Sequence, residues 1–190
     1  MRPIILAAIA AIAAISADVV LSGVSSPAAA ADATRIERHW ARQVEADWRT
    51  PNPEYAPGGS EPQEYGIRYE FGPNGQTVTG ELSGVFSTDE GERRAPYWRF
   101  FSYVDPATDG IVFLQIGWNG AVGAGRFIDT GDDAIDERLI QTFTAPDGST
   151  SELRHDTVWT SETERRSSVF GRDEAGEWAL QQEWIWTRQE

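Results

Sequence analysis

The sequence contains no cysteine in its 190 residues. This excludes disulfide bonds, thiolate metal sites and a lipidated cysteine after an export signal. Basic residues are also scarce, because 16 Lys and Arg stand against 30 Asp and Glu and leave a formal net charge of −14 at pH 7. Such a chain is repelled by phosphate backbones and anionic surfaces, so nucleic acid is not expected as a partner. The folded domain must be stable through its core alone.

Long apolar runs are missing except at the N-terminus, where residues 3–17 follow Arg2. A stretch of small residues with Ala-x-Ala patterns comes next. This order is typical of a cleaved secretory signal, so we expect residues 1–31 to be removed and the protein to be exported, to the periplasm or the medium. Asp18 interrupts the apolar stretch and disfavours an uncleaved anchor. Stable membrane insertion after cleavage is therefore not expected.

Residues 32–190 have the length of one domain. Thr34 and Glu37 have the spacing of a capping box, and apolar residues follow at intervals of four up to Trp48. We predict a helix over about 34–48, whose tryptophan stripe plugs or braces one end of a sheet. Residues 49–62 carry four prolines and two glycines and predict a loop rather than a strand.

Between residues 64 and 188, turn residues separate segments in which apolar and polar positions alternate. This alternation is typical of strands with one solvent-exposed face. About nine such segments, joined by tight turns, predict an all-β, up-and-down antiparallel β-barrel. The charged residues 88–94 are expected to form a loop. The segment 111–118 is apolar on both faces, so its outer side needs a cover, for which the N-terminal helix is the candidate. Glycines between 117 and 125 are expected where the sheet bends or bulges.

The last predicted strand carries Trp178, Leu180, Trp184 and Trp186 at alternate positions. With a period of two residues these side chains share one face, with Gln182 between them. A strand that is apolar on one face needs a sheet that curls over it. We therefore expect all of these side chains to point into the barrel.

The segments 125–133 (GRFIDTGDD), 143–159 (FTAPDGSTSELRHDTVW) and 176–188 (GEWALQQEWIWTR) resemble the second half of a bacterial family of unknown function with lipocalin-like, calycin-type barrels. Members of that family typically close with a Gly-x-Trp step and an aromatic-x-Arg ending. Both features are present in the segment 176–188.

The resemblance implies an interior cavity for a small, mainly apolar molecule, and it implies neither a particular ligand nor a reaction. It also implies that a tryptophan near the first strand packs over an arginine from the last strand and closes one end of the barrel. Trp48 and Arg188 are the candidates for this structural pair.

His155 shares a strand face with Leu153, Thr157 and Trp159, so it is expected to point inward with them. Barrels similar to this one include haem binders with one axial histidine from the inner wall, and His155 could take that part. A single histidine defines no site, so we favour a hydrogen-bonded interior histidine and expect no cofactor. His39, on the flank of the predicted helix, is a weaker candidate.

Two other clusters are discounted. The segment 132–137 (DDAIDE) is acidic but lacks the glycine and the spacing of a calcium loop, so we interpret it as a solvated turn and predict no metal site. Ser167 and Ser168 have no evident base nearby, and we assign no catalytic residue.

The leading hypothesis is a module that binds a small hydrophobic or amphipathic molecule inside the barrel. The predicted lining residues are Tyr69, Trp98, His155, Trp159, Gln182, Trp184 and Trp186. Two alternatives remain: a small calycin-like enzyme, an isomerase or hydrolase that uses His155, and a structural or partner-binding envelope protein with a filled barrel. A cavity in the structure would separate the first hypothesis from the last. The oligomeric state is left open.

Overall fold

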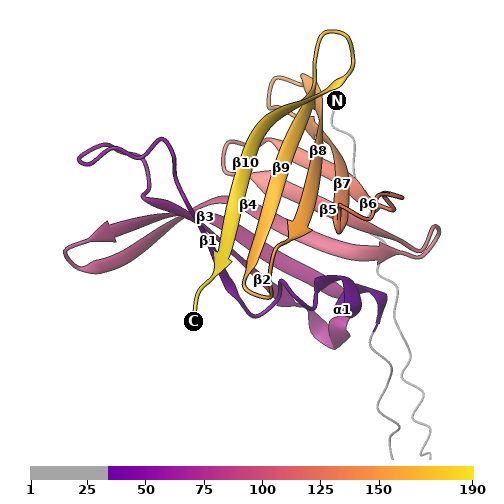
Figure 1. Ribbon diagram of the computed structural model, residues 1–190, viewed down its shortest axis with the longest axis horizontal. Coiled ribbons are helices and arrows are strands. Elements are labelled where there is room, and N and C mark those ends of the chain that lie inside the picture. The colour runs from indigo at the N-terminus through magenta and orange to yellow at the C-terminus, as the bar shows by residue number, and fades with distance from the viewer. Residues whose placement is uncertain (1–33) are drawn as a thin grey trace, which may run out of the picture. The chain divides into compact units, whose positions relative to one another are not determined.

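The computed structural model describes residues 34–190 (Figure 1). The predicted signal segment, residues 1–31, lies outside the described residues. The elements in chain order are α1 (Arg35–Trp40), β1 (Asp47–Pro51), β2 (Glu64–Phe71), the short 3-10 helix η1 (Pro73–Gly75), β3 (Thr77–Thr88), β4 (Gly91–Asp105), β5 (Gly110–Gly117), β6 (Val122–Ile128), β7 (Glu137–Thr144), β8 (Thr150–Trp159), β9 (Glu164–Arg172) and β10 (Trp178–Arg188).

The ten strands form one closed antiparallel barrel in which each strand from β1 to β10 pairs with its neighbour in the chain. This confirms the predicted all-β, up-and-down barrel with one short N-terminal helix. The barrel has one strand more than the nine or so that the pattern predicts, because β1 lies in a segment that the sequence assigns to a helix and a loop.

The start of α1 follows the prediction, but its end does not. The Thr34 hydroxyl accepts a hydrogen bond from the Glu37 backbone N–H at 3.2 Å, and the Glu37 carboxylate accepts one from the Thr34 N–H at 2.6 Å. The helix then ends at Trp40 instead of continuing to residue 48. Glu45 takes a positive φ of 59° and reverses the chain, after which Trp48 lies in β1. Residues 49–51, predicted as loop, belong to this strand because their backbone pairs with β2.

The helix closes one end of the barrel, as predicted. The Trp40 ring lies 4.8 Å from the ring of Tyr69 and 5.8 Å from that of Phe113, measured between ring centres, and both rings face the barrel interior. The helix does not cover the outer face of β5, however. Ile116 on that face is 58% exposed, so the expectation of a covered outer side is wrong there.

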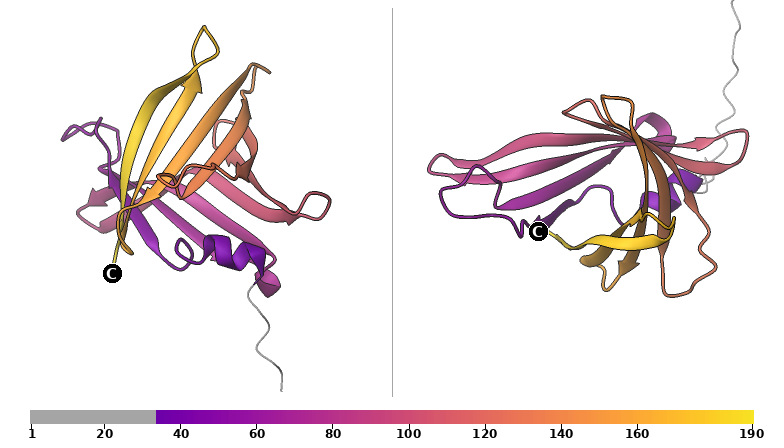
Figure 2. Two further views of the ribbon diagram at one scale, coloured as in Figure 1. Left: turned by 45° about the vertical axis from the view of Figure 1, so that its right-hand side comes forward. Right: turned by 90° about the horizontal axis from the view of Figure 1, so that it is seen from above.

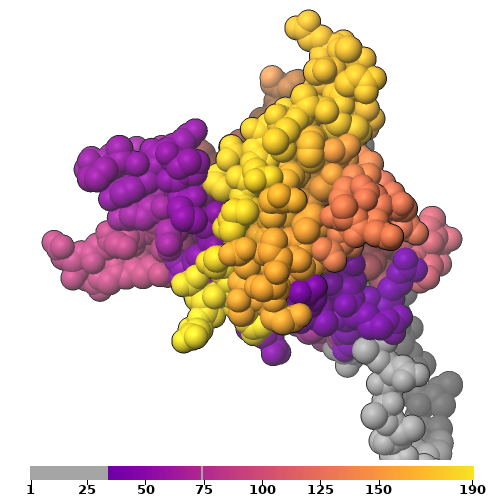
Figure 3. Space-filling view, viewed as in Figure 1, coloured from indigo at the N-terminus to yellow at the C-terminus, as the bar shows by residue number. Residues whose placement is uncertain are grey.

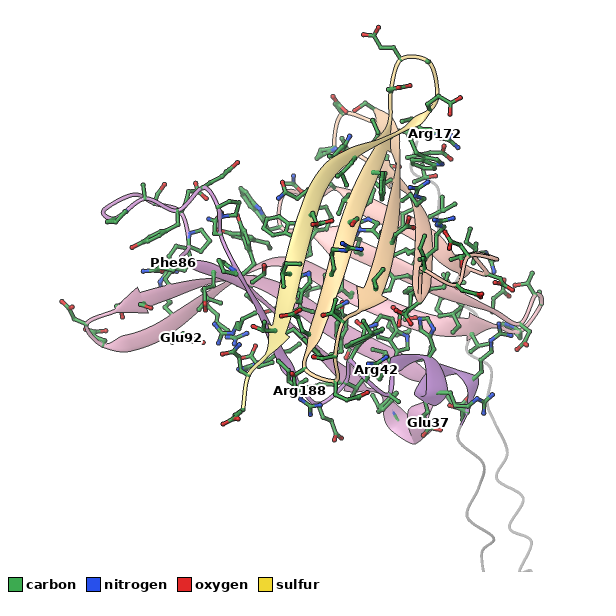
Figure 4. The ribbon with its side chains drawn as sticks, in the orientation of Figure 1. Glu37, Arg42, Phe86, Glu92, Arg172 and Arg188 are labelled. Carbon is green, nitrogen blue, oxygen red and sulfur yellow. The ribbon has the colours of Figure 1, made fainter. Side chains whose placement is uncertain are left out.

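β3 and β4 extend beyond the barrel as a long hairpin, and the loop that follows β1 lies beside it (Figures 1 and 2). Most of the predicted charged loop 88–94 is strand in this hairpin, with a tight turn before Gly91. An ion pair connects the hairpin to β1: the Arg49 guanidinium contacts Glu92 at 2.8 Å, and it also contacts Asp47 of its own strand at 2.9 Å. Figure 4 shows Glu92 on this projecting hairpin.

β10 contains a bulge that reverses the orientation of its first residues. Leu180 pairs with Phe170 and Gln182 pairs with Val169, so Gln181 is an extra residue in the strand. Trp178 consequently lies on the outer face, where the Arg172 guanidinium stacks at 3.9 Å from its ring centre, and Leu180 is 57% exposed. The prediction that Trp178 and Leu180 share the inner face with Trp184 and Trp186 is therefore wrong.

The barrel closes through a short seam. β1 and β10 pair only at Trp48 with Arg188 and at Arg49 with Thr187. Beyond these pairs β10 diverges from β1, and its remaining residues are paired with β9 alone (Figure 1). The side chains of β9 and β10 form a continuous surface on the face seen in Figure 3. The seam holds the two ends of the sheet together with two residue pairs.

Candidate ligand-binding cavity

The barrel encloses a cavity of about 440 Å³. This volume falls in the range of roughly 300–1,000 Å³ that is usual for small-molecule sites. Aromatic side chains from the helix and from six strands make up much of the wall: Trp40, Tyr69, Trp98, Phe100, Phe113, Phe127, Phe143, Trp184 and Trp186. Such a wall suits an apolar ligand body.

Five of the seven residues predicted to line the interior do so: Tyr69, Trp98, His155, Trp184 and Trp186. Trp159 instead lies at the plugged end, where its ring centre is 5.4 Å from that of Trp48 and 4.1 Å from the Arg42 guanidinium. The side-chain amide of Gln182 donates to the Glu183 carbonyl at 3.4 Å and is not part of the cavity wall. Whether the five residues bind a ligand stays a prediction.

Arg165 on β9 lies at the plugged end of the cavity and is only 5% exposed. Its guanidinium carbon lies 5.4 Å from the ring centre of Trp48 and 5.8 Å from that of Trp186. The arginine over Trp48 is thus Arg165 and not Arg188. Arg188 is opposite Trp48 in the register of β1 and β10, and its side chain is exposed at the end of β10 (Figure 4). This corrects the predicted structural pair.

Glu137 also differs from its prediction, because it is not part of a solvated turn. It begins β7 and faces the cavity, where the buried Gln43 amide donates to its carboxylate at 3.1 Å. Burial raises the pKa of the Glu137 carboxyl to about 7, against the charge of Arg165 and a hydrogen bond from the Trp159 side chain, which both lower it. Near neutral pH this carboxyl is partly protonated.

His155 lies in the middle of the cavity wall. Burial lowers the pKa of its imidazole to about 4, against the charge of Asp156, which raises it, so the ring is neutral at pH 7. The buried Nε2 atom of His155 has no hydrogen-bond partner among the described residues. Close to it in the sheet, Gln141 accepts a hydrogen bond from the Gln115 amide at 3.0 Å, while its own Nε2 atom has no partner within residues 34–190. The cavity therefore contains polar atoms that are free to bond to a guest.

His39 does not line this cavity, and its ring packs at 4.3 Å from that of Phe127. Burial lowers the pKa of His39 to about 4, with a smaller effect of the Arg35 charge in the same direction. Within residues 34–190 no three His, Asp or Glu side chains are grouped so that they could hold a metal ion. No helix in the same range is long and apolar enough to cross a membrane.

Sequence reasoning missed Arg165 and Glu137 as cavity residues. Alternation along β9 places Arg165, Ser167 and Val169 on one face, and that face could have been matched to the inner face of β8. The signal is weak because two arginines stand side by side at 165 and 166, so the pattern alone leaves open which of them points inward. For Glu137, three neighbouring carboxylates in the turn hide the one that enters the barrel.

The fold and the cavity together define an all-β, up-and-down barrel with an aromatic interior to which the described residues contribute one arginine and one glutamate. A comparison with protein-family models finds no match to the chain, and a search of curated proteins finds no relative.

Proposed function

We propose that this protein is exported and binds a small apolar or amphipathic molecule inside its barrel. The observation that carries the proposal is the cavity of about 440 Å³ with its aromatic wall. Ligand sites are typically concave and mostly apolar, with a few polar groups that orient the guest. The resemblance of the second half of the chain to lipocalin-like barrels supports the same reading.

The cavity also weighs against the alternatives. A structural protein with a filled barrel would leave no space of this size among the described residues. An isomerase or hydrolase that uses His155 needs an acid to orient the imidazole. The neighbouring acid, Asp156, instead accepts hydrogen bonds from Arg138 at 2.6 and 2.9 Å. Binding without chemistry accounts for the site with fewer assumptions.

The test uses 1-aminoanthracene, an uncharged apolar probe whose fluorescence rises in apolar surroundings. We expect saturable binding to the mature protein with a stoichiometry of one. Leu153→Trp places an indole in the cavity, because Leu153 is part of its wall, and is expected to weaken binding at least about tenfold. Leu180→Trp is the matched control, since Leu180 is exposed on the outer face of β10. Equal loss in both variants, or no saturable binding at all, would contradict the proposal.

Native mass spectrometry of the protein purified from its own exported compartment tests both parts of the proposal together. A polypeptide mass that lacks residues 1–31 supports signal cleavage. An additional mass that disappears on denaturation supports a non-covalent ligand and allows it to be identified. A full-length mass would contradict cleavage.

A further inference from the structure

The interior of the barrel contains a positive charge, Arg165, that no carboxylate of the described residues contacts directly. No Asp or Glu oxygen of the described residues lies within 4.0 Å of the Arg165 guanidinium, whereas the Arg138 guanidinium lies 2.6 Å from Asp156. The Nε and Nη2 atoms of Arg165 are buried and have no hydrogen-bond partner in the part of the chain that the structure describes. A buried charge is costly unless it is paired and hydrogen-bonded.

The surrounding indoles compensate only part of this cost. The rings of Trp48, Trp159 and Trp186 lie between 5.4 and 5.8 Å from the guanidinium carbon, which is within the range of cation–π attraction. An aromatic face attracts the charge, but it does not accept the directed N–H bonds of the fork as an oxygen does. The Arg165 group is thus held in place by its indoles and left with free donors.

Glu137 does not fill this role. Among the described residues it is the one acid in the cavity wall, yet it lies beyond ion-pair distance of Arg165 and accepts its hydrogen bond from Gln43. Tyr69 bonds to Arg165 through its side chain and supplies an oxygen, but not a full negative charge. The Arg165 fork therefore still lacks a directly bonded anion among the described residues.

We propose that the natural ligand carries an anionic head group, of which a carboxylate is the simplest form, and that Arg165 binds this group at the plugged end of the cavity. The apolar body of the ligand then lies along the aromatic wall towards the opposite end. The proposal rests on the proposed function, because it specifies the chemistry of the molecule that the cavity holds. A guanidinium suits this task, since its planar fork can donate two parallel bonds to a carboxylate.

The unpartnered atoms further along the barrel agree with this orientation. The free Nε2 of Gln141 is a donor only, and the neutral His155 ring offers one N–H and one acceptor. A hydroxyl or carbonyl on the ligand body could bond to either. Such groups would favour an oxygenated amphipathic acid over a plain hydrocarbon.

The experiment compares three molecules with the same ten-carbon chain: decanoate, 1-decanol and decylammonium. Each displaces 1-aminoanthracene from the mature protein at pH 7.5, and the displacement constants are compared. We expect decanoate to bind at least about tenfold more tightly than 1-decanol, because buried charge-assisted hydrogen bonds are worth more than neutral ones. Decylammonium is expected to bind most weakly, since its charge repels Arg165.

Two neighbouring residues give a matched pair of variants. Arg165→Met keeps the volume and removes the charge, and it should reduce decanoate binding to the level of 1-decanol. Arg166→Met removes the neighbouring charge, which lies outside and contacts Glu183 at 3.8 Å, and it should leave the preference unchanged. Arg165→Lys keeps a positive charge and should retain part of the preference.

The outcomes separate this inference from the proposed function. If decanoate and 1-decanol bind equally to the wild type, the anionic head group is wrong and the cavity remains a binding site. If the preference survives in Arg165→Met, or decylammonium binds best, Arg165 is not the anchor. If neither the probe nor any ten-carbon molecule binds, both proposals fail. The wild-type comparison decides the question even if Arg165→Met does not fold.

Discussion

The guanidinium of Arg165 lies 5.4 Å from the ring centre of Trp48, the position that the resemblance to calycin barrels implies for Arg188. Arg165 is held between strands β8, β9 and β10 and the first strand, because Trp159, Trp186 and Trp48 all surround it. It thereby connects residues from both sides of the seam. The same side chain closes the barrel and presents free donors to its interior.

Replacement of this arginine should separate packing from charge. We expect Arg165→Ala to be less stable than Arg165→Met by at least about 2 kcal/mol, because alanine leaves a hole among three indoles while methionine fills it. Arg188→Ala should change the free energy of unfolding by less than about 0.5 kcal/mol, since Arg188 is exposed. Urea unfolding of the three variants measures these values. A larger loss of unfolding free energy in Arg188→Ala than in Arg165→Ala would mean that Arg188, and not Arg165, closes the barrel.

Glu137 should make stability depend on pH. Its pKa is about 7 in the folded chain against 4.5 for an ordinary glutamate, so its stabilising contribution is complete below about pH 4.5 and is lost as the pH rises through 7. Glu137→Gln removes this loss. We expect the stability of the variant relative to wild type to increase by about 2 kcal/mol between pH 5 and pH 8, allowing for partial hydration of the carboxyl.

The control for this prediction is Glu174→Gln, at an exposed turn before β10. Its stability relative to wild type should stay constant over the same pH range. A parallel course of the Glu137→Gln and wild-type curves would mean that the pKa of the Glu137 carboxyl is the same in the folded and the unfolded chain.

The bulge in β10 places Leu180 on the outer face, whereas simple alternation would place it in the core. Leu180→Gln should change the free energy of unfolding by less than about 0.5 kcal/mol, because Leu180 faces solvent. Trp186→Ala should cost about 3–5 kcal/mol, because Trp186 is buried against Arg165. The midpoints of urea denaturation measure both effects, provided that the dependence of the unfolding free energy on urea concentration is unchanged. Equal costs would place Leu180 in the core and argue against the bulge.

Gly125 on β6 allows two strands to approach closely. A Cβ atom there would lie 2.0 Å from the Ile140 carbonyl oxygen, a backbone atom that cannot move aside. We expect Gly125→Ala to destabilise the barrel by at least about 2 kcal/mol. Gly131→Ala is the control, since a Cβ there meets nothing within 4 Å and the only cost, about 1 kcal/mol, comes from its positive φ of 59°. Similar costs at both sites would contradict the close approach.

Local patterns were sufficient to predict the type of fold. Alternation within strands and turn residues between them specify a meander, and the capping box at Thr34 marks the start of the helix correctly. The end of that helix could not be predicted, because Trp40, Val44 and Trp48 keep a helical spacing and are all buried although only the first is helical. The pairing of residues 47–51 with β2 decides against the helix, and that contact is not local.

The residues of the cavity wall could be predicted only in part, again because some of their positions depend on contacts between strands. Tyr69, Trp98 and Trp184 follow from alternation, which is a property of each strand taken alone. The bulge at Gln181 depends on register with β9, and the inward direction of Arg165 depends on its three indoles. Both are relations between strands, and no single segment of the chain contains them.

The seam between β1 and β10 has a consequence for the order of assembly. All other strand pairs join neighbours in the chain and can form one hairpin after another, whereas this pair joins the two ends of the sheet and closes a loop of almost the whole domain. With two residue pairs it is also the weakest junction, so we expect it to form last and to open first, with faster amide hydrogen exchange in β1 than in β8. Since α1 closes one end of the barrel, transient separation of β1 and β10 would let a ligand enter through the barrel wall.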